Sequence, residues 1–170
     1  MQAYTSEKTA RKQIPGLYLK AKALGEWIPG SSHVDIGSGP WGLLEKTLRE
    51  KEDVKASSYD PFNLPYSHNR KIAKAFDKSA DSVSLCNVLN VIAEPLVRKS
   101  VLELAKSFLE PGGNCMISVY EGNKSGEGQP TRDGWQENRK LYRYMLEIQE
   151  VFPIVEIKGG IILAREYSPQ

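Results

Sequence analysis

The chain has 170 residues, of which 40% are hydrophobic and 26% are charged, and its net charge is +2. Domains commonly contain about 100–200 residues, so this length and composition predict one globular domain spanning residues 1–170. The small net charge excludes a polycation that coats nucleic acid through bulk charge, but it does not exclude a local basic patch. No window approaches 18 consecutive apolar residues, so no membrane span is expected.

Two features favour an intracellular, cytoplasmic protein. The first residues lack the apolar core of a secretory signal. Cys86 and Cys115 stand alone, without further cysteines or histidines at metal-ligand spacing, which argues against a disulfide scaffold and against a metal site. His33 and His68 also have no partner in the sequence, so we expect structural or surface roles for both.

Positive charge is concentrated near the N-terminus. Residues 1–25 hold five basic residues and one acidic residue, a local net charge of +4. Residues 16–27 show helical spacing of apolar side chains, and Pro29-Gly30 is expected to end that helix. Residues 1–29 are therefore predicted to form a basic helical segment whose charges either face solvent or contact phosphate groups.

Strands and helices alternate along the rest of the chain. The expected strands are 32–36, 54–59, 81–89 and 114–120, followed by a terminal β-hairpin of 151–157 and 161–165 joined by a Gly-Gly turn. The expected helices are 43–50, 95–109 and 135–150. The remaining stretches are expected to be a loop at 61–70, a weak element at 72–76 and a mobile loop at 121–133.

This order of elements predicts an α/β fold. Strands that alternate with helices pair in parallel, so we expect a mostly parallel sheet with helices on both faces and a C-terminal antiparallel β-hairpin. Ligands of such sheets bind outside the carboxyl ends of the strands. The motifs below lie at those ends.

A glycine-rich run, DIGSGPWG at 35–42, follows the first predicted strand and precedes a predicted helix. Glycines at this position allow a tight turn and a close approach of the backbone to a ligand. Asp60 ends the next strand 23 residues after Gly37, near the spacing of about 20 expected for a carboxylate that holds ribose hydroxyls. The pattern predicts a ligand that contains a nucleoside.

A nicotinamide dinucleotide is compatible with the glycine spacing, so an NAD-dependent oxidoreductase is one alternative. Two features argue against it. Asp35 lies within the end of the strand, where its carboxylate would repel a pyrophosphate and suit a cationic or amino-bearing ligand. A chain of 170 residues also leaves no room for a separate substrate domain.

These segments resemble the class I S-adenosylmethionine (SAM)-dependent methyltransferases over roughly residues 30–166. The matching segments are VDIGSGPWG (34–42), Tyr59-Asp60, DSVSLCNVL (81–89), LEPGG (109–113) and the final hairpin. The resemblance implies a Rossmann-like methyltransferase fold that binds SAM as its cofactor.

Within this superfamily, NVLNVIAEP (87–95), followed by Arg98, resembles a segment of methyltransferases associated with DNA phosphorothioation. The stretch 128–136 and the ending GGIILAR are also similar to that group. The sequence departs from it at 137–139, where ENR replaces an aromatic-rich run, and it lacks the additional domains of larger members.

By this resemblance, Asp35, Gly37, Ser38 and Gly39 bind the methionine part of SAM. Asp60 accepts hydrogen bonds from the ribose hydroxyls. Asn87 contacts the cofactor at its sulfonium and faces the incoming methyl acceptor, which makes it the candidate catalytic residue.

The methyl acceptor is less clearly indicated. An (D/N)PP(Y/F) loop for exocyclic amine methylation is absent, because residues 87–90 read NVLN, and Cys86 lacks the preceding proline of a cytosine C5 nucleophile. Tyr120 and Glu121, at the end of a predicted strand, and Arg139 on the predicted 135–150 helix are candidate substrate contacts. That helix would mix aromatic and basic side chains, which is typical either of stacking with phosphate contact or of aromatics that pack inward beneath solvated charges.

The sequence therefore predicts a single-domain SAM-dependent methyltransferase, with nucleic acid, DNA or RNA, as the proposed methyl acceptor. One alternative is a non-catalytic SAM-binding module or subunit. Another is a methyltransferase that acts on a small molecule or a protein.

Overall fold

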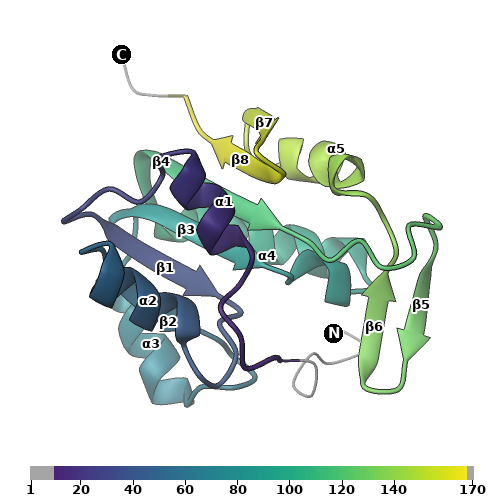
Figure 1. Ribbon diagram of the computed structural model, residues 1–170, viewed down its shortest axis with the longest axis horizontal. Helices are drawn as coiled ribbons and strands as arrows, with labels where there is room; N and C mark the ends of the chain where they lie inside the picture. Colours follow the sequence, from purple (N-terminus) through teal and green to yellow (C-terminus); the bar gives the residue numbers. More distant parts are fainter. Residues whose placement is uncertain (1–9, 168–170) are drawn as a thin grey trace.

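The computed structural model describes residues 10–167, which form a six-stranded sheet flanked by helices (Figure 1). The strand order is β2-β1-β3-β4-β8-β7. The strands are β1 (Ser32–Ile36), β2 (Lys55–Tyr59), β3 (Ala80–Cys86), β4 (Leu109–Ser118), β7 (Ile154–Lys158) and β8 (Ile161–Arg165). The first four pair in parallel, whereas β8 runs antiparallel to both β4 and β7. The predicted mostly parallel sheet with a terminal antiparallel hairpin is confirmed.

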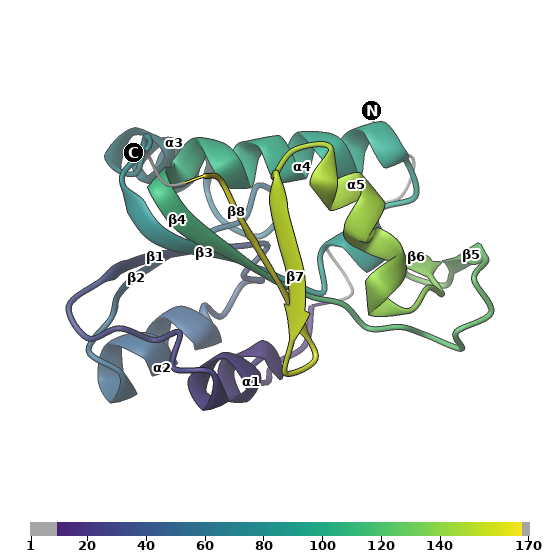
Figure 2. The same cartoon turned by 90° about the horizontal axis from the view of Figure 1, so that it is seen from above.

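Helices cover both faces of this sheet, as Figure 2 shows. On one face lie α1 (Leu17–Ala23) and α2 (Leu43–Lys51), whose buried side chains, including Leu17, Leu44 and Leu48, pack on Met116 and Leu163. On the other face lie α3 (Tyr66–Ala75), α4 (Pro95–Phe108) and α5 (Met145–Gln149). Each fully buried leucine contributes about 1.5–3 kcal/mol, so these two apolar clusters hold the layers together.

Side chains alternate along β1, and this alternation places polar groups on one face. Val34 and Ile36 belong to the cluster beneath α3 and α4, so His33 and Asp35 project toward the α1–α2 side of the sheet. The parallel register sets His33 opposite Ser82 and Asp35 opposite Ser84. Two neighbouring strands therefore carry polar side chains next to one another inside the sheet layer.

The expected helix at 135–150 does not form. This part of the chain instead contains β6 (Gly134–Glu137), which pairs with β5 (Gly128–Thr131), a 3-10 turn (Leu141–Tyr144) and the short α5. The Trp135 ring lies so close to the Gly128 backbone that a Cβ at residue 128 would clash with it. Cross-strand packing of this kind overrides the helical spacing of the apolar side chains. Tyr142, Arg143 and Tyr144 share the 3-10 turn, whereas Trp135 lies in β6 and Arg139 and Lys140 lie between the two elements.

Other boundaries also differ from expectation, among them the end of β3 at Cys86 rather than at residue 89 and the start of β7 at Ile154 rather than at residue 151. The first described helix ends at Ala23, because Gly25 adopts φ +74° and reverses the chain before Pro29. Residues 66–70, expected to be loop, form the start of α3, because both prolines of that stretch precede the helix. The strand expected at 114–120 begins at Leu109, and the Pro-Gly-Gly sequence produces a register shift rather than a break.

Only part of the basic N-terminal segment can be compared with the prediction. Residues 1–9 lie outside the described residues, and residues 10–16 precede α1 without forming a helix. Across residues 10–167, no helix is long and apolar enough to cross a membrane.

Candidate functional site

A cavity of about 890 Å³ opens at the carboxyl ends of the parallel strands. It is lined by seven of the predicted site residues, Asp35, Gly37, Ser38, Gly39, Asp60, Asn87 and Tyr120. Its volume falls within the range of about 300–1,000 Å³ that is usual for small-molecule sites. The structure thus brings most of the predicted residues together around one space.

The glycine turn between β1 and α2 is shaped by its lack of side chains. Gly37 has φ +75° and donates its N–H to the carbonyl of Tyr59 at 2.8 Å. A Cβ at this residue would lie 2.5 Å from Cγ2 of Val88, which no real side chain tolerates. Gly39 has φ +70° and also lines the cavity. Glycine is therefore required at residue 37 both by backbone conformation and by the space available.

Asp60 anchors this turn to the loop after β2. One carboxylate oxygen accepts the N–H groups of Phe62 and Asn63, at 2.9 and 3.0 Å. The other accepts the N–H of Gly39 and the side-chain amide of Asn63, each at 2.9 Å. A carboxylate offers about four lone-pair sites, and these four donors occupy them. The predicted contact of Asp60 with ribose hydroxyls would therefore have to displace or share a donor that the protein already provides.

Within the described part of the chain, Asp35, unlike Asp60, is not surrounded by backbone donors that bind its carboxylate. Its side chain is 2% exposed, it lines the cavity, and it accepts a hydrogen bond from Ser84 Oγ at 2.6 Å. Burial raises the pKa of the Asp35 carboxyl to about 7, and the nearby acids Asp60 and Glu45 act in the same direction, while Ser84 opposes them. A buried carboxylate surrounded by other acids gains most from a positively charged ligand. Asp35 is thus the group in this cavity that best suits a cation.

Asn87 directly follows β3 and lines the cavity. It is exposed, adopts a left-handed conformation with φ +57°, and donates its N–H to the carbonyl of Ser118 at 2.9 Å. Asparagine tolerates this conformation better than most residues. Asn90 lies in the 3-10 helix that follows (Leu89–Val91) and was not predicted. It is buried, lines the cavity and directs its amide N–H₂ at Gln136 Oε1 over 3.4 Å.

The three predicted substrate contacts occupy different places. Tyr120 lies at the rim of the cavity and is 59% exposed. Glu121 and Arg139 do not line it. Glu121 accepts the N–H of Leu141 at 2.8 Å, and Arg139 pairs with Glu147 at 2.9 Å and stacks on the ring of Tyr144. The prediction that Glu121 and Arg139 contact the substrate therefore finds no support in their positions.

The β5–β6 hairpin supplies a cavity wall that the sequence did not predict. Its residues Thr131, Trp135 and Gln136 line the space, and Trp135 Nε1 donates to Glu137 at 2.9 Å. Gln136 Nε2 donates to the carbonyl of Tyr120 at 3.0 Å, which ties the hairpin to the end of β4. Because the segment was predicted to be loop and helix, its role as a wall could not be expected.

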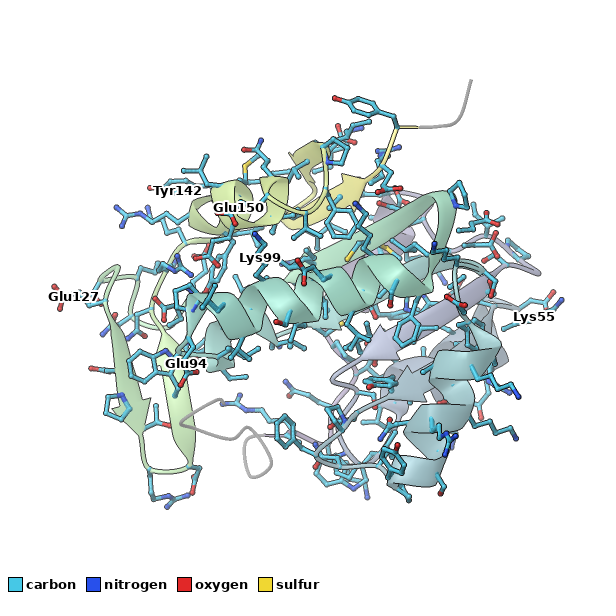
Figure 3. The ribbon with its side chains drawn as sticks, turned by 180° about the vertical axis from the view of Figure 1, so that it is seen from behind. Lys55, Glu94, Lys99, Glu127, Tyr142 and Glu150 are labelled. Carbon is cyan, nitrogen blue, oxygen red and sulfur yellow. The ribbon has the colours of Figure 1, made fainter. Side chains whose placement is uncertain are left out.

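A buried ion-pair network holds both α5 and the hairpin against α4, and its contact with the hairpin is the 3.8 Å pair of Arg98 Nη1 with Glu137 Oε2 of β6. Arg98 donates to both carboxylate oxygens of Glu147, at 2.8 and 2.9 Å, and to the carbonyl of Ile92. At the next residue of α4, on the surface, Lys99 pairs with Glu150, which follows α5, at 3.2 Å (Figure 3). The described residues contain no group of three or more His, Cys, Asp or Glu side chains placed to hold a metal ion.

Comparisons with known proteins show the fold. No protein-family model and no curated protein matches the sequence. Among solved structures, a Burkholderia thailandensis 1,6-didemethyltoxoflavin-N1-methyltransferase, crystallised with 1,6-didemethyltoxoflavin and S-adenosylhomocysteine, is similar with a TM-score of 0.62 and 13% identity. The match covers 89% of this chain and 76% of that one.

Two further structures are similar at the same level. A Haemonchus contortus phosphoethanolamine N-methyltransferase has a TM-score of 0.55 and 17% identity, with 85% of this chain and 39% of that one covered. DesVI of Streptomyces venezuelae has a TM-score of 0.55 and 11% identity, and the match covers 90% of this chain and 93% of DesVI. The chain therefore has the Rossmann-like fold of class I SAM-dependent methyltransferases.

Proposed function

We propose that the protein is a SAM-dependent methyltransferase. The observation that carries this proposal is Asp35, a buried carboxylate that faces a cavity beside the glycine turn and has the acids Asp60 and Glu45 near it. SAM is a cation at its sulfonium and carries an amino group, so it matches this environment, whereas a pyrophosphate would be repelled. The fold shared with methyltransferases supports the same conclusion.

Methyl transfer from a sulfonium is an in-line displacement, and the protein's main task is to align the donor with the acceptor. Such alignment contributes up to about 7–11 kcal/mol at the limit. The glycine turn would hold the methionine part of SAM, and Asn87 would lie between the sulfonium and the acceptor. No general base is needed unless the acceptor must lose a proton early.

Titration calorimetry with SAM and S-adenosylhomocysteine tests the proposal. The Gly37→Ala variant should lose binding, because its Cβ would meet Val88 and distort the turn. Gly25→Ala is the matched control: Gly25 has a similar φ of +74°, yet a Cβ there meets nothing within 4 Å. Failure of the folded wild-type protein to bind either compound would refute the proposal.

A nucleic acid acceptor is the first specific candidate. Three exposed aromatic residues, Trp41, Phe62 and Tyr120, line the cavity, and its two basic lining residues are Arg11 and Lys20. Exposed aromatics can stack on unpaired bases while basic groups neutralise phosphates. The resemblance of residues 87–95 to phosphorothioation-associated methyltransferases agrees with DNA. The predicted aromatic–basic helix, which would have added support, is absent.

A small planar molecule is the second candidate. The hairpin wall of Thr131, Trp135 and Gln136 bears no charge and presents an indole ring to the cavity. The names of two structurally similar proteins refer to N-methylation of small molecules. This wall suits a flat, uncharged acceptor better than a phosphate backbone.

Incubation with SAM labelled in its methyl group distinguishes these candidates. The protein would be mixed in parallel with single-stranded DNA, RNA, peptides and a small-molecule extract. Label in DNA or RNA supports the nucleic acid candidate, and label only in small molecules excludes it. If the protein binds SAM but transfers label to no fraction, and if Asn87→Ala binds SAM as the wild type does, these results would favour a non-catalytic SAM-binding module.

A further inference from the structure

A continuous line of hydrogen bonds runs through the sheet to Asp35. His33 Nδ1 lies 2.8 Å from Ser82 Oγ, and His33 Nε2 lies 2.9 Å from Ser84 Oγ. Ser84 Oγ then donates to Asp35 Oδ1 at 2.6 Å. His33 and Ser84 are fully buried, and Ser82 is 9% exposed. The line alternates between β1 and β3, so it depends on the register of these two strands.

The donors in this line all point the same way. Because the Ser84 hydroxyl gives its hydrogen to the carboxylate, its oxygen is free to accept the N–H of His33 Nε2. His33 Nδ1 then carries no hydrogen and accepts from the Ser82 hydroxyl. This neutral tautomer satisfies all three bonds, and burial, which lowers the pKa of His33 to about 3, keeps the ring uncharged.

The position of His33 is fixed from the other side as well. The edge of the Trp27 ring packs on it at a centroid distance of 5.2 Å and an angle of 88°. Trp27 itself is held by a hydrogen bond from Nε1 to the carbonyl of Tyr18 at 3.0 Å. The imidazole therefore has little freedom to turn away from Ser84.

Other titratable groups also act on Asp35. They are Asp60 on the loop after β2, Glu45 on α2 and the Cys86 thiol at the end of β3. Both acids and burial favour protonated Asp35, whereas the Ser84 hydroxyl is the first of the groups that favour the ionised form. The Ser84 hydroxyl thus stabilises ionised Asp35, whereas burial and the two acids stabilise protonated Asp35.

We propose that Ser84 and His33 are positioning residues for the ligand site at Asp35, and that they set the pH range in which the cavity binds a cation. Ser84 contacts the carboxylate directly and His33 acts through Ser84. The identification of the cation as SAM rests on the proposed function, but the hydrogen-bonded line does not.

This role predicts a distinctive pH dependence. Ionised Asp35 attracts a cation and protonated Asp35 does not, so affinity should fall by about tenfold per pH unit below the midpoint. Loss of the Ser84 hydroxyl removes a hydrogen bond to the charged form, which moves the midpoint to higher pH. A merely structural role would instead lower affinity to the same extent at every pH.

The test is SAM titration calorimetry between pH 6 and pH 9 on four variants. Ser84→Ala should move the midpoint upward by about one pH unit while binding near pH 9 stays close to wild type. His33→Leu should also move the midpoint of SAM binding upward, but by less than Ser84→Ala. His33→Gln keeps an N–H that can donate to Ser84, so its midpoint should return to the wild-type value. Ser57→Ala, a nearly buried serine on β2 opposite Val34, is the control and should leave the midpoint unchanged. A wild-type midpoint in both Ser84→Ala and His33→Leu would overturn the proposal.

A second measurement separates this proposal from the proposed function. The carboxyl ¹³C signal of Asp35 would be titrated by NMR in ligand-free protein. If its midpoint rises in Ser84→Ala and His33→Leu but no variant binds SAM, the positioning role stands and the methyltransferase proposal fails. If the Asp35 midpoint does not move, the positioning role fails whatever the protein binds.

Discussion

The backbone N–H of Gly39 donates to Asp60 Oδ2 at 2.9 Å, and this bond joins the glycine turn to the loop after β2. Two loops that are separate in the sequence are thereby held as one cavity wall. Asp60 acts as an acceptor for backbone donors, whereas Asp35 keeps its carboxylate beside the cavity. Both aspartates were expected to contact the ligand, but Asp60 is already bonded to four donors of the protein, whereas Asp35 accepts from Ser84.

Replacement of Asp60 should cost stability. In Asp60→Asn the new amide N–H₂ would face N–H groups that now donate to the carboxylate, leaving at least one of them without an acceptor. An unsatisfied buried donor costs about 1–3 kcal/mol in the free energy of unfolding. Urea denaturation measures this loss. Asp77→Asn, at an exposed residue, should change stability by less than about 0.5 kcal/mol, and equal stability of the two variants would contradict the prediction.

Replacement of Asp35 should have the opposite effect at high pH. The folded-state pKa of about 7 lies above the ordinary value of 3.8, so the folded protein binds a proton more tightly than the unfolded chain does. The stability that this provides is present below about pH 4 and is lost as pH rises through 7. Asp35→Asn should therefore be more stable than wild type at pH 8 and similar to it at pH 4, while losing SAM binding. Urea denaturation at pH 4 and pH 8 measures the difference in the free energy of unfolding between Asp35→Asn and wild type. The same difference at both pH values would contradict the prediction.

His33 should contribute to acid sensitivity. Burial lowers its folded-state pKa to about 3 from an ordinary value of 6.5. Its contribution to stability is complete above pH 6.5 and is lost as the pH falls toward 3, because the unfolded chain takes up the proton first. The His33→Gln variant has no such group. Acid unfolding followed by circular dichroism should show wild type losing more stability than His33→Gln between pH 6.5 and 4, and parallel curves would refute this.

Two adjacent ion pairs on α4 should differ in their importance. Arg98 is buried and bonds both oxygens of Glu147, whereas Lys99 and Glu150 are largely exposed. Arg98→Ala leaves the Glu147 carboxylate with one fewer buried partner and should lower the free energy of unfolding by about 3–5 kcal/mol. Lys99→Ala should cost no more than about 1 kcal/mol. Thermal or urea denaturation of both variants provides the comparison, and equal losses would show that burial of the Arg98 pair has no special effect.

Sequence reasoning placed the glycine turn and Asp35 at the cavity, but it did not predict the hairpin wall. The run at 35–42, with a strand before it and a helix after it, is a local pattern, so its turn and the place of Asp35 followed from spacing alone. The β5–β6 hairpin depends on Trp135 packing over Gly128, a contact between residues that no helical or strand period links. For this reason residues 121–133 were expected to be a loop and residues 135–137 the start of a helix.

The line from His33 to Asp35 was partly visible in the sequence. The segments SHVDI and SVSLC both alternate polar and apolar residues, which predicts one polar face on each strand. The register that places Ser84 between His33 and Asp35 is a property of the assembled sheet and cannot be derived from either segment. For this reason His33 was assigned only a structural or surface role.

The origin of the cavity walls has an evolutionary consequence. The glycine turn, Asp35 and Asn87 all come from residues 35–87, whereas Trp135 and Gln136 come from a two-stranded hairpin outside the main sheet. Replacement of that hairpin would leave every strand of the main sheet in register. Descendants of this scaffold could thus change the ligand that meets the hairpin wall by remodelling about ten residues, while inheriting the glycine turn, Asp35 and Asn87 intact.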